Sequence, residues 1–289
     1  MLTRRIATLS VGVTVGVTVG FWLATAASAR AAPREIESFD DPSAALAELV
    51  KRPRVIAFGE FHELKDSKKT LSALAHFHQH ILAALLPLAS DLIVETWVTT
   101  GSCGEQEKAV VAQVEKTTQR PATTEDEIVT VMKQAKAAGV APHMLEIDCH
   151  AYQGLTDPET GKVDYIRLLT LVTAGLERKI VAALAAGKTA KSDKRVLVYG
   201  GALHNDVFPR KELAAYSFAR AIAKETRGRY LEVDLYVPEY IEADKDITAQ
   251  AWYPRYLREA KPGKVVRVRR SRGSYILVFP RAAGPGASP

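Results

Sequence analysis

Two short apolar segments of the sequence end in acidic or imidazole side chains. Residues 54–59 lead directly into Glu60 and His62, and the uncharged run after Asp91 ends at Glu95. A carboxylate at such a place is partly desolvated, which is costly unless a cation, a metal or a histidine hydrogen bond relieves it. We therefore predict that Glu60, His62 and Glu95 belong to a functional site.

Two later segments end in the same types of side chain. One late apolar run is followed by Gly200, Gly201 and then His204. Glycines let the backbone turn sharply and let a ligand come close, so His204 is predicted to complete the site. Gly201 and Asn205 are secondary candidates. Asp148 and His150, which end another apolar run, are secondary candidates as well.

Carboxylates and imidazoles together support two kinds of chemistry. In the first, His62 or His204 is the general base that activates water, while Glu60 and Glu95 orient and tune it, which gives direct hydrolysis of an ester or amide. In the second, the same four residues bind a divalent metal such as zinc or manganese, which lowers the pKa of bound water. The sequence has no G-x-S-x-G nucleophile motif, no G-x-G-x-x-G and no phosphate-binding loop.

Other histidines and acids have simpler interpretations. The run "HFHQH" places His76 and His80 at metal-binding spacing on a helix, but Phe77 stands where a metalloprotease would have Glu. His78 falls on the apolar stripe of this helix and is interpreted as a core histidine. Glu63 is interpreted as a helix-terminal acid, which the positive end of the following helix favours.

The apolar runs alternate with helical patterns, which predicts an α/β fold with a mostly parallel central sheet and helices on both faces. The C-terminal segments "KVVRVRR" and "SYILVFP" flank "SRG" and predict an antiparallel hairpin at the edge. In such sheets ligands bind outside the carboxyl ends of the strands, so the four strand ends are predicted to share one site. The predicted strands are 54–59, 91–95, 140–148, 195–199 and 230–236, and the predicted helices are 65–89, 105–118, 124–138, 163–186 and 209–226, after a polar segment, 33–53, with a short helical stretch.

The first 31 residues have the plan of a secretory signal peptide: two arginines, an apolar stretch over 6–24 and a small-x-small cleavage site. An uncleaved membrane anchor is the alternative. We expect an exported protein, periplasmic or secreted, with a single α/β domain over 34–281 and a disordered tail over 282–289. Removing three arginines with the signal lowers the net charge from +6 to +3.

The remaining basic residues gather near the C-terminus, but no nucleic-acid-binding module accompanies them, so no nucleic acid partner is expected. Cys103 and Cys149 are the two cysteines of the chain. In an exported protein they either pair or remain separate thiols, and the sequence leaves this open.

The ordered motifs resemble the Tiki superfamily, which includes ChaN-like haem-binding uptake proteins, erythromycin-esterase-like proteins, and the TraB and Tiki proteins. Its G-E-x-H motif matches Gly59, Glu60 and His62, its second strand ends in Glu as at Glu95, and its G-x-x-H motif ends at His204. The order and spacing are most similar to the ChaN-like branch. The first motif of the esterase branch has an extra residue between Glu and His, which this sequence lacks.

The resemblance implies an α/β fold and several activities. Erythromycin-esterase-like members are hydrolases that use His and Glu, Tiki proteins are metal-dependent proteases, and ChaN-like members bind haem. We expect a hydrolase, with or without a metal, that acts on a small-molecule ester or a peptide. The alternative is a haem- or iron-binding protein of the cell envelope with His62 or His204 as axial ligand, and an inactive family member is a third reading. Contact with a membrane is expected only through an uncleaved signal.

Overall fold

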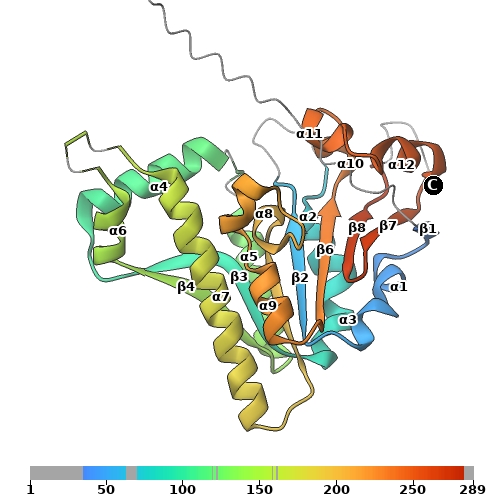
Figure 1. Cartoon of the computed structure of the whole chain (residues 1–289), viewed down its shortest axis with the longest axis horizontal. Helices are drawn as coiled ribbons and strands as arrows, with labels where there is room; N and C mark the ends of the chain where they lie inside the picture. The colour runs from blue at the N-terminus through green and yellow to red at the C-terminus, as the bar shows by residue number, and fades with distance from the viewer. Residues whose placement is uncertain are drawn as a thin grey trace, which may run out of the picture. The chain divides into compact units, whose positions relative to one another are not determined.

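A central sheet of eight strands organises the part of the chain that the structure describes (Figure 1). The computed structural model describes residues 35–62, 70–118, 120–121, 123–157, 159–160 and 162–282. All of them belong to one compact unit, Ala32–Pro289. The predicted signal peptide, Glu63 and the tail beyond Ala282 lie outside the described residues.

The sheet is mostly parallel, as the sequence predicted. Its strand order is β1-β7-β8-β6-β2-β5-β3-β4, with antiparallel pairing only of β7 with β1 and with β8. Because β2, β5, β3 and β6 run parallel, their carboxyl ends meet at one edge. The strands are β1 (Glu35–Phe39), β2 (Val55–Glu60), β3 (Ala89–Thr100), β4 (Ala141–Asp148), β5 (Arg195–Gly201), β6 (Tyr230–Tyr236), β7 (Val265–Ser271) and β8 (Ser274–Val278).

Helices cover both faces of the sheet, which confirms the predicted fold class (Figure 1). Ile56 and Phe58 of β2 pack with α1, α2, α3 and α5 on one face. Val55 and Ala57 alternate with them and pack with α7 and α9 on the other. The helices are α1 (Pro42–Leu46), α2 (Ala73–Phe77), α3 (Ala83–Leu85), α4 (Gly104–Thr118), α5 (Thr123–Ala137), α6 (Cys149–Leu155), α7 (Tyr165–Thr189), α8 (Ala202–Asn205), α9 (Ala219–Glu225), α10 (Pro238–Ile241), α11 (Lys245–Thr248) and α12 (Tyr253–Glu259).

Several predicted boundaries were wrong. The described part of the first long helix begins at α2, capped by Ser72, and continues through a π-helical turn, His78–Leu82. The strand predicted over 91–95 extends to Thr100, because β4 pairs with its polar end from Trp97 onward. The helix predicted over 209–226 is instead a 3-10 turn, Lys211–Tyr216, followed by α9.

The C-terminal hairpin forms as predicted but does not make the sheet edge. β8 pairs in parallel with β6, and β1, which the sequence did not predict, covers β7 from outside. Arg267 and Arg269 of β7 form ion pairs with Glu37 and Glu35 of β1. The first strand therefore balances much of the positive charge of this basic segment.

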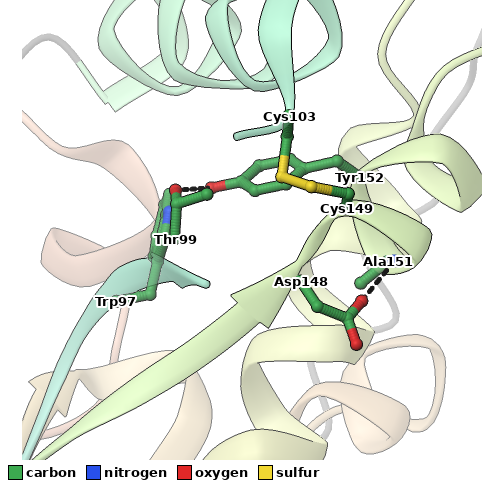
Figure 2. The surroundings of a disulfide bond; sticks show 7 residues. All are labelled: Trp97, Thr99, Cys103, Asp148, Cys149, Ala151 and Tyr152. Carbon is green, nitrogen blue, oxygen red and sulfur yellow. Dashed lines mark hydrogen bonds between the residues drawn. A yellow bond between two sulfur atoms is a disulfide. The ribbon is translucent and has the colours of Figure 1, made fainter. Parts of the chain in front are cut away.

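A disulfide joins Cys103 to Cys149, so the pairing left open by the sequence is present (Figure 2). It ties the residue before α4 to the first residue of α6. Beside it, the Tyr152 hydroxyl accepts a hydrogen bond from Trp97 Nε1 at 3.0 Å and lies 2.9 Å from Thr99 Oγ1. The disulfide and these contacts fasten α4 and α6 to the end of β3. In the part of the chain that the structure describes, we find no helix with the length and apolar character that a membrane span requires.

Candidate active site at the strand ends

The structure brings together the four main residues predicted from the sequence. Glu60 is the last residue of β2, and His62 follows it with Nδ1 2.9 Å from Glu60 Oε1. Glu95 lies in β3, with Oε1 3.5 Å from Nε2 of His204 in α8. The backbone of Gly201 lies between the two pairs, and its N–H donates to Glu95 Oε2 at 2.5 Å. The two Glu–His pairs are therefore parts of one site at the carboxyl edge of the sheet.

Glycines after β5 are required by these side chains. A Cβ added at Gly200 would lie 2.5 Å from Glu95 Oε2, and one added at Gly201 would lie 2.9 Å from His62 Nε2. Both distances are shorter than a real Cβ contact. The sequence interpreted the glycines as room for a ligand, but the structure shows that they make room for the carboxylate and imidazole of the site itself.

Glu60 is a buried carboxylate held by two hydrogen-bond donors. Its side chain is 7% exposed, Tyr199 Oη donates to Oε2 at 2.5 Å, and His62 contacts Oε1. Burial alone would raise the pKa of Glu60, but the hydrogen bond with His62 and the charge of Arg120 outweigh burial and lower it. Burial and the negative charge of Glu60 raise the pKa of Tyr199 well above its usual value, so Tyr199 stays a neutral donor.

Glu60 orients the ring of His62. A carboxylate only accepts hydrogen bonds, so Nδ1 of His62 carries the hydrogen that is donated to Glu60. Arg120 lies against the same ring, with its Nη2 2.7 Å from Nε2 of His62 and 2.6 Å from Nδ1. With Nδ1 held by Glu60, Nε2 is the ring nitrogen of His62 that is left to exchange a proton with a reactant.

The contacts of His204 place a hydrogen on each of its ring nitrogens. Its Nδ1 lies 3.1 Å from the carbonyl oxygen of Tyr216 and 2.8 Å from Thr173 Oγ1, whose own hydrogen is donated to the carbonyl of Leu169. Nδ1 therefore donates. Nε2 faces the carboxylate of Glu95, so it carries a hydrogen too. With both nitrogens as donors, His204 is an imidazolium.

The charges of this second pair support each other. Burial alone would raise the pKa of Glu95, but the positive charge and hydrogen bond of His204 hold it well below its usual range. Burial alone would lower the pKa of His204, but the negative charge and hydrogen bond of Glu95 raise it. Glu95 and His204 therefore form an ion pair beside His62.

Sequence reasoning missed the other residues of the site. Arg120 lies between α4 and α5, with its Nη2 3.4 Å from Glu60 Oε1. Tyr165 begins α7; burial and the negative charge of Glu95 raise its pKa, while the positive charge of Arg120 lowers it. Thr173 was detectable, because it is a polar residue on the buried stripe of α7. No local pattern marks Arg120 or Tyr165, because only tertiary packing brings them to the strand ends.

The secondary candidates have mainly structural roles. Asp148 is the N-cap of α6 and accepts from the N–H of Ala151 at 2.8 Å, and His150 is exposed (Figure 2). Asn205 is buried and donates to the carbonyl of Ala57 at 3.3 Å, which fastens α8 to β2. Of these candidates, only Gly201 directly contacts the Glu–His pairs.

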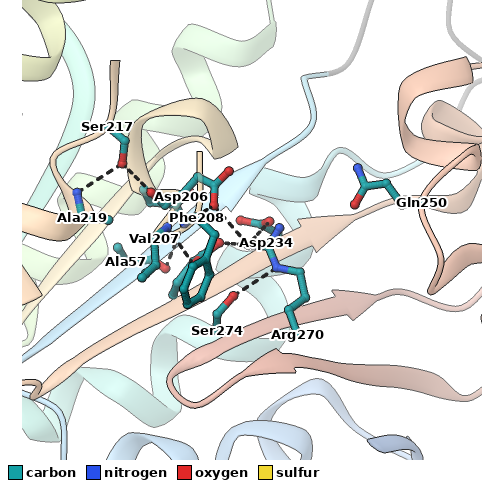
Figure 3. A network of polar contacts seen from close by, with 12 residues as sticks. Ala57, Asp206, Val207, Phe208, Ser217, Ala219, Asp234, Gln250, Arg270 and Ser274 are labelled. Atoms are coloured by element: carbon teal, nitrogen blue, oxygen red, sulfur yellow. Dashed lines mark hydrogen bonds and ion pairs between the residues drawn. The ribbon is translucent and has the colours of Figure 1, made fainter. Parts of the chain in front are cut away.

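A buried polar network holds the segment that follows His204 (Figure 3). Glu232 accepts from the N–H of Val207 at 3.0 Å, and it forms an ion pair with Arg270. Arg270 also lies 3.0 Å from Asp234 and donates to Ser274 Oγ at 3.0 Å. Through Val207, this network fixes the backbone just beyond α8 and so helps to position His204.

The four residues do not fit a divalent metal in this arrangement. Nδ1 of His62 is hydrogen-bonded to Glu60, and the guanidinium of Arg120 lies beside both. Within the described ranges, no group of three or more His, Cys, Asp or Glu side chains is arranged to hold a metal ion. That statement includes the "HFHQH" run, in which His76 stacks on Phe279 with ring centroids 4.1 Å apart.

The structure thus defines an α/β protein with two Glu–His pairs and an arginine at the strand ends. No family model matches the chain, and no curated protein matches it. Among solved structures, the type III effector HopBA1 is similar, with 10% identity over 86% of this chain and 98% of that chain and a TM-score of 0.43. A likeness this distant says nothing about activity.

Proposed function

We propose that this protein is a hydrolase that activates water with His62 and cleaves an ester or peptide bond. The observation that carries the proposal is the contact of His62 Nδ1 with the buried carboxylate of Glu60. Glu60 accepts the Nδ1–H, which leaves Nε2 as the nitrogen that can take a proton from water. A carboxylate that orients an imidazole is the usual arrangement of a general base.

The proposed reaction uses no covalent intermediate with the protein. His62 takes a proton from water as its oxygen attacks the carbonyl carbon, and the resulting imidazolium gives that proton to the departing alcohol or amine. Cys103 and Cys149 are bonded to each other, so neither is a thiol nucleophile.

We expect this activity to need no metal. The supporting observation is that Arg120 already lies among the side chains that would be ligands. Dialysis against EDTA is expected to leave the rate unchanged. A rate lost on dialysis and restored by Mn²⁺ or Zn²⁺ would show that the side chains rearrange around a metal.

Haem binding, the alternative from the sequence, has less support from the geometry. Both nitrogens of His204 are occupied as donors, and its side chain is 4% exposed. His62, with 29% exposure, is the better axial candidate, but its Nε2 contacts Arg120. A Soret shift of haemin with the wild-type protein, lost in His62→Asn, would favour this alternative over the hydrolase.

Export remains part of the proposal, and the disulfide supports it, because structural disulfides persist mainly in oxidising compartments. We also propose membership of the Tiki superfamily. The support is that the motif residues Glu60, His62, Glu95 and His204 lie in one site, as the resemblance implies.

The test is hydrolysis of a panel of 4-nitrophenyl esters and coumarin-labelled peptides. His62→Asn is expected to lower kcat/KM by about 10²–10⁴-fold, because the general base is lost. His150→Asn is the matched control, since this histidine is exposed and outside the site. Equal activity of the two variants, or no hydrolysis by the wild-type protein, would refute the proposal.

A further inference from the structure

One hydrogen-bond donor of Arg120 is unpaired in the site. The side chain is 21% exposed, and its Nη2 lies 2.7 Å from Nε2 of His62. Its Nε–H is buried and has no hydrogen-bond acceptor among the residues that the structure describes. Nε and Nη2 form one edge of the guanidinium, and that edge matches a carboxylate or phosphate with two parallel hydrogen bonds.

The carboxylates of the protein do not fill this role. Glu60 already accepts from Tyr199 and His62, and its Oε1 is 3.4 Å from Nη2 of Arg120. Glu95 accepts from the backbone of Gly201 and pairs with His204. On this edge of Arg120, Nη2 is thus paired with Glu60, whereas the Nε–H has no acceptor among the described residues, although a buried donor is costly to leave unpaired.

We propose that Arg120 binds an anionic oxygen group, a carboxylate or a phosphate, on the substrate. This inference rests on the proposed hydrolase function. It assigns the substrate class: small esters or peptides that carry such a group near the bond to be cleaved. When Arg120 turns to the anion, Nη2 leaves Nε2 of His62, and that nitrogen becomes available to water. An anionic substrate therefore both docks on Arg120 and releases the base.

Binding is tested first, without any catalytic readout. Acetate and inorganic phosphate are titrated into the full-length ¹⁵N-labelled protein, and the Nε–H signal of Arg120 is followed by NMR. Arg120→Gln assigns the signal by its loss. Both anions are expected to shift the signal to saturation, and uncharged acetamide is expected to leave it in place. Absence of a shift with either anion, or an equal shift with acetamide, would overturn the inference.

Activity then tests the substrate class with two esters of similar length. The wild-type protein is expected to hydrolyse 4-nitrophenyl hemisuccinate with at least tenfold higher kcat/KM than neutral 4-nitrophenyl butyrate. Arg120→Gln should raise KM for the anionic ester tenfold or more, and should leave kcat/KM for the neutral ester unchanged or higher. Arg178→Gln removes an exposed arginine of α7 and is the matched control, which should behave as wild type.

The two proposals fail in different ways. If the anions bind through Arg120 but neither ester is hydrolysed, the hydrolase function fails and the anion site stands. If both esters are hydrolysed at equal rates and acetate does not bind, the hydrolase function stands and the role of Arg120 is refuted. A loss of activity on both esters in Arg120→Gln, with kcat reduced equally, would make Arg120 part of the general catalytic machinery and would also refute the inference.

Discussion

Removal of the disulfide is expected to cost a large part of the stability of this protein. The bond closes a loop with a sequence separation of 46 residues. Loop-closure entropy for that length corresponds to about 4 kcal/mol at 25 °C in the chain-entropy description. The change proposed is the double substitution Cys103→Ala and Cys149→Ala. Alanine is chosen because Cys103 is 6% exposed, and a serine hydroxyl there would be buried.

Urea unfolding measures the effect. The free energy of unfolding should fall by about 4 kcal/mol in the double variant, and by a similar amount in the wild-type protein under reducing conditions. Each single variant should lose about as much as the double variant, because either substitution breaks the bond. A double variant within about 1 kcal/mol of wild type would refute the reasoning, since an ordinary point substitution has an effect of that size.

Three further changes test other parts of the structure. Gly59→Ala should destabilise the fold by about 1–3 kcal/mol or more in urea unfolding, because the new Cβ would lie 2.6 Å from the backbone of α8. Gly154→Ala is the control, since a Cβ added at Gly154 would have nothing within 4 Å. Equal effects of the two substitutions would contradict the reasoning. Burial and the charge of His80 lower the pKa of His76 from 6.5 to about 4, so the unfolded chain takes up the proton first as the pH falls. The free energy of unfolding of the wild-type protein should therefore fall between pH 6.5 and pH 4, by up to about 3 kcal/mol and by less to the extent that the ring is solvated. His76→Phe should lack this fall. Glu95→Gln should lower the pKa of His204 in an NMR titration, because the burial of the ring remains when the negative charge is gone. In the wild-type protein, the stability that comes from this raised pKa is complete below pH 6.5 and is lost as the pH rises through the folded-state pKa of His204. An unchanged titration of His204 in the variant would refute the ion pair.

The strand-end residues were predictable because two local signals coincide there. A short apolar run of β-forming residues marks a buried strand, and a charged residue directly after it must lie at the sheet edge. This reasoning placed Glu60, His62, Glu95 and His204 correctly relative to one another. The alternation of such runs with helical segments also gave the fold class, since few arrangements bury both element types.

The rest depends on contacts between distant parts of the chain. Arg120 reaches Glu60 because the packing of α4 and α5 carries it there, and neighbouring residues give no sign of this. β1 is a polar segment that becomes a strand because β7, far along the sequence, offers a free edge and basic partners for Glu35 and Glu37. Tyr199 was hidden because it belongs to the apolar run of β5 and shows its polar function only through Glu60.

The two histidines of the site differ in their partners. His204 lies against Glu95, whereas His62 lies against both Glu60 and Arg120. Nη2 of Arg120 is within 2.7 Å of both ring nitrogens of His62. When His62 takes the proton of water it becomes an imidazolium, and an imidazolium and a guanidinium at that distance repel each other. Movement of Arg120 toward an anionic substrate would therefore remove this repulsion at the step in which His62 takes the proton.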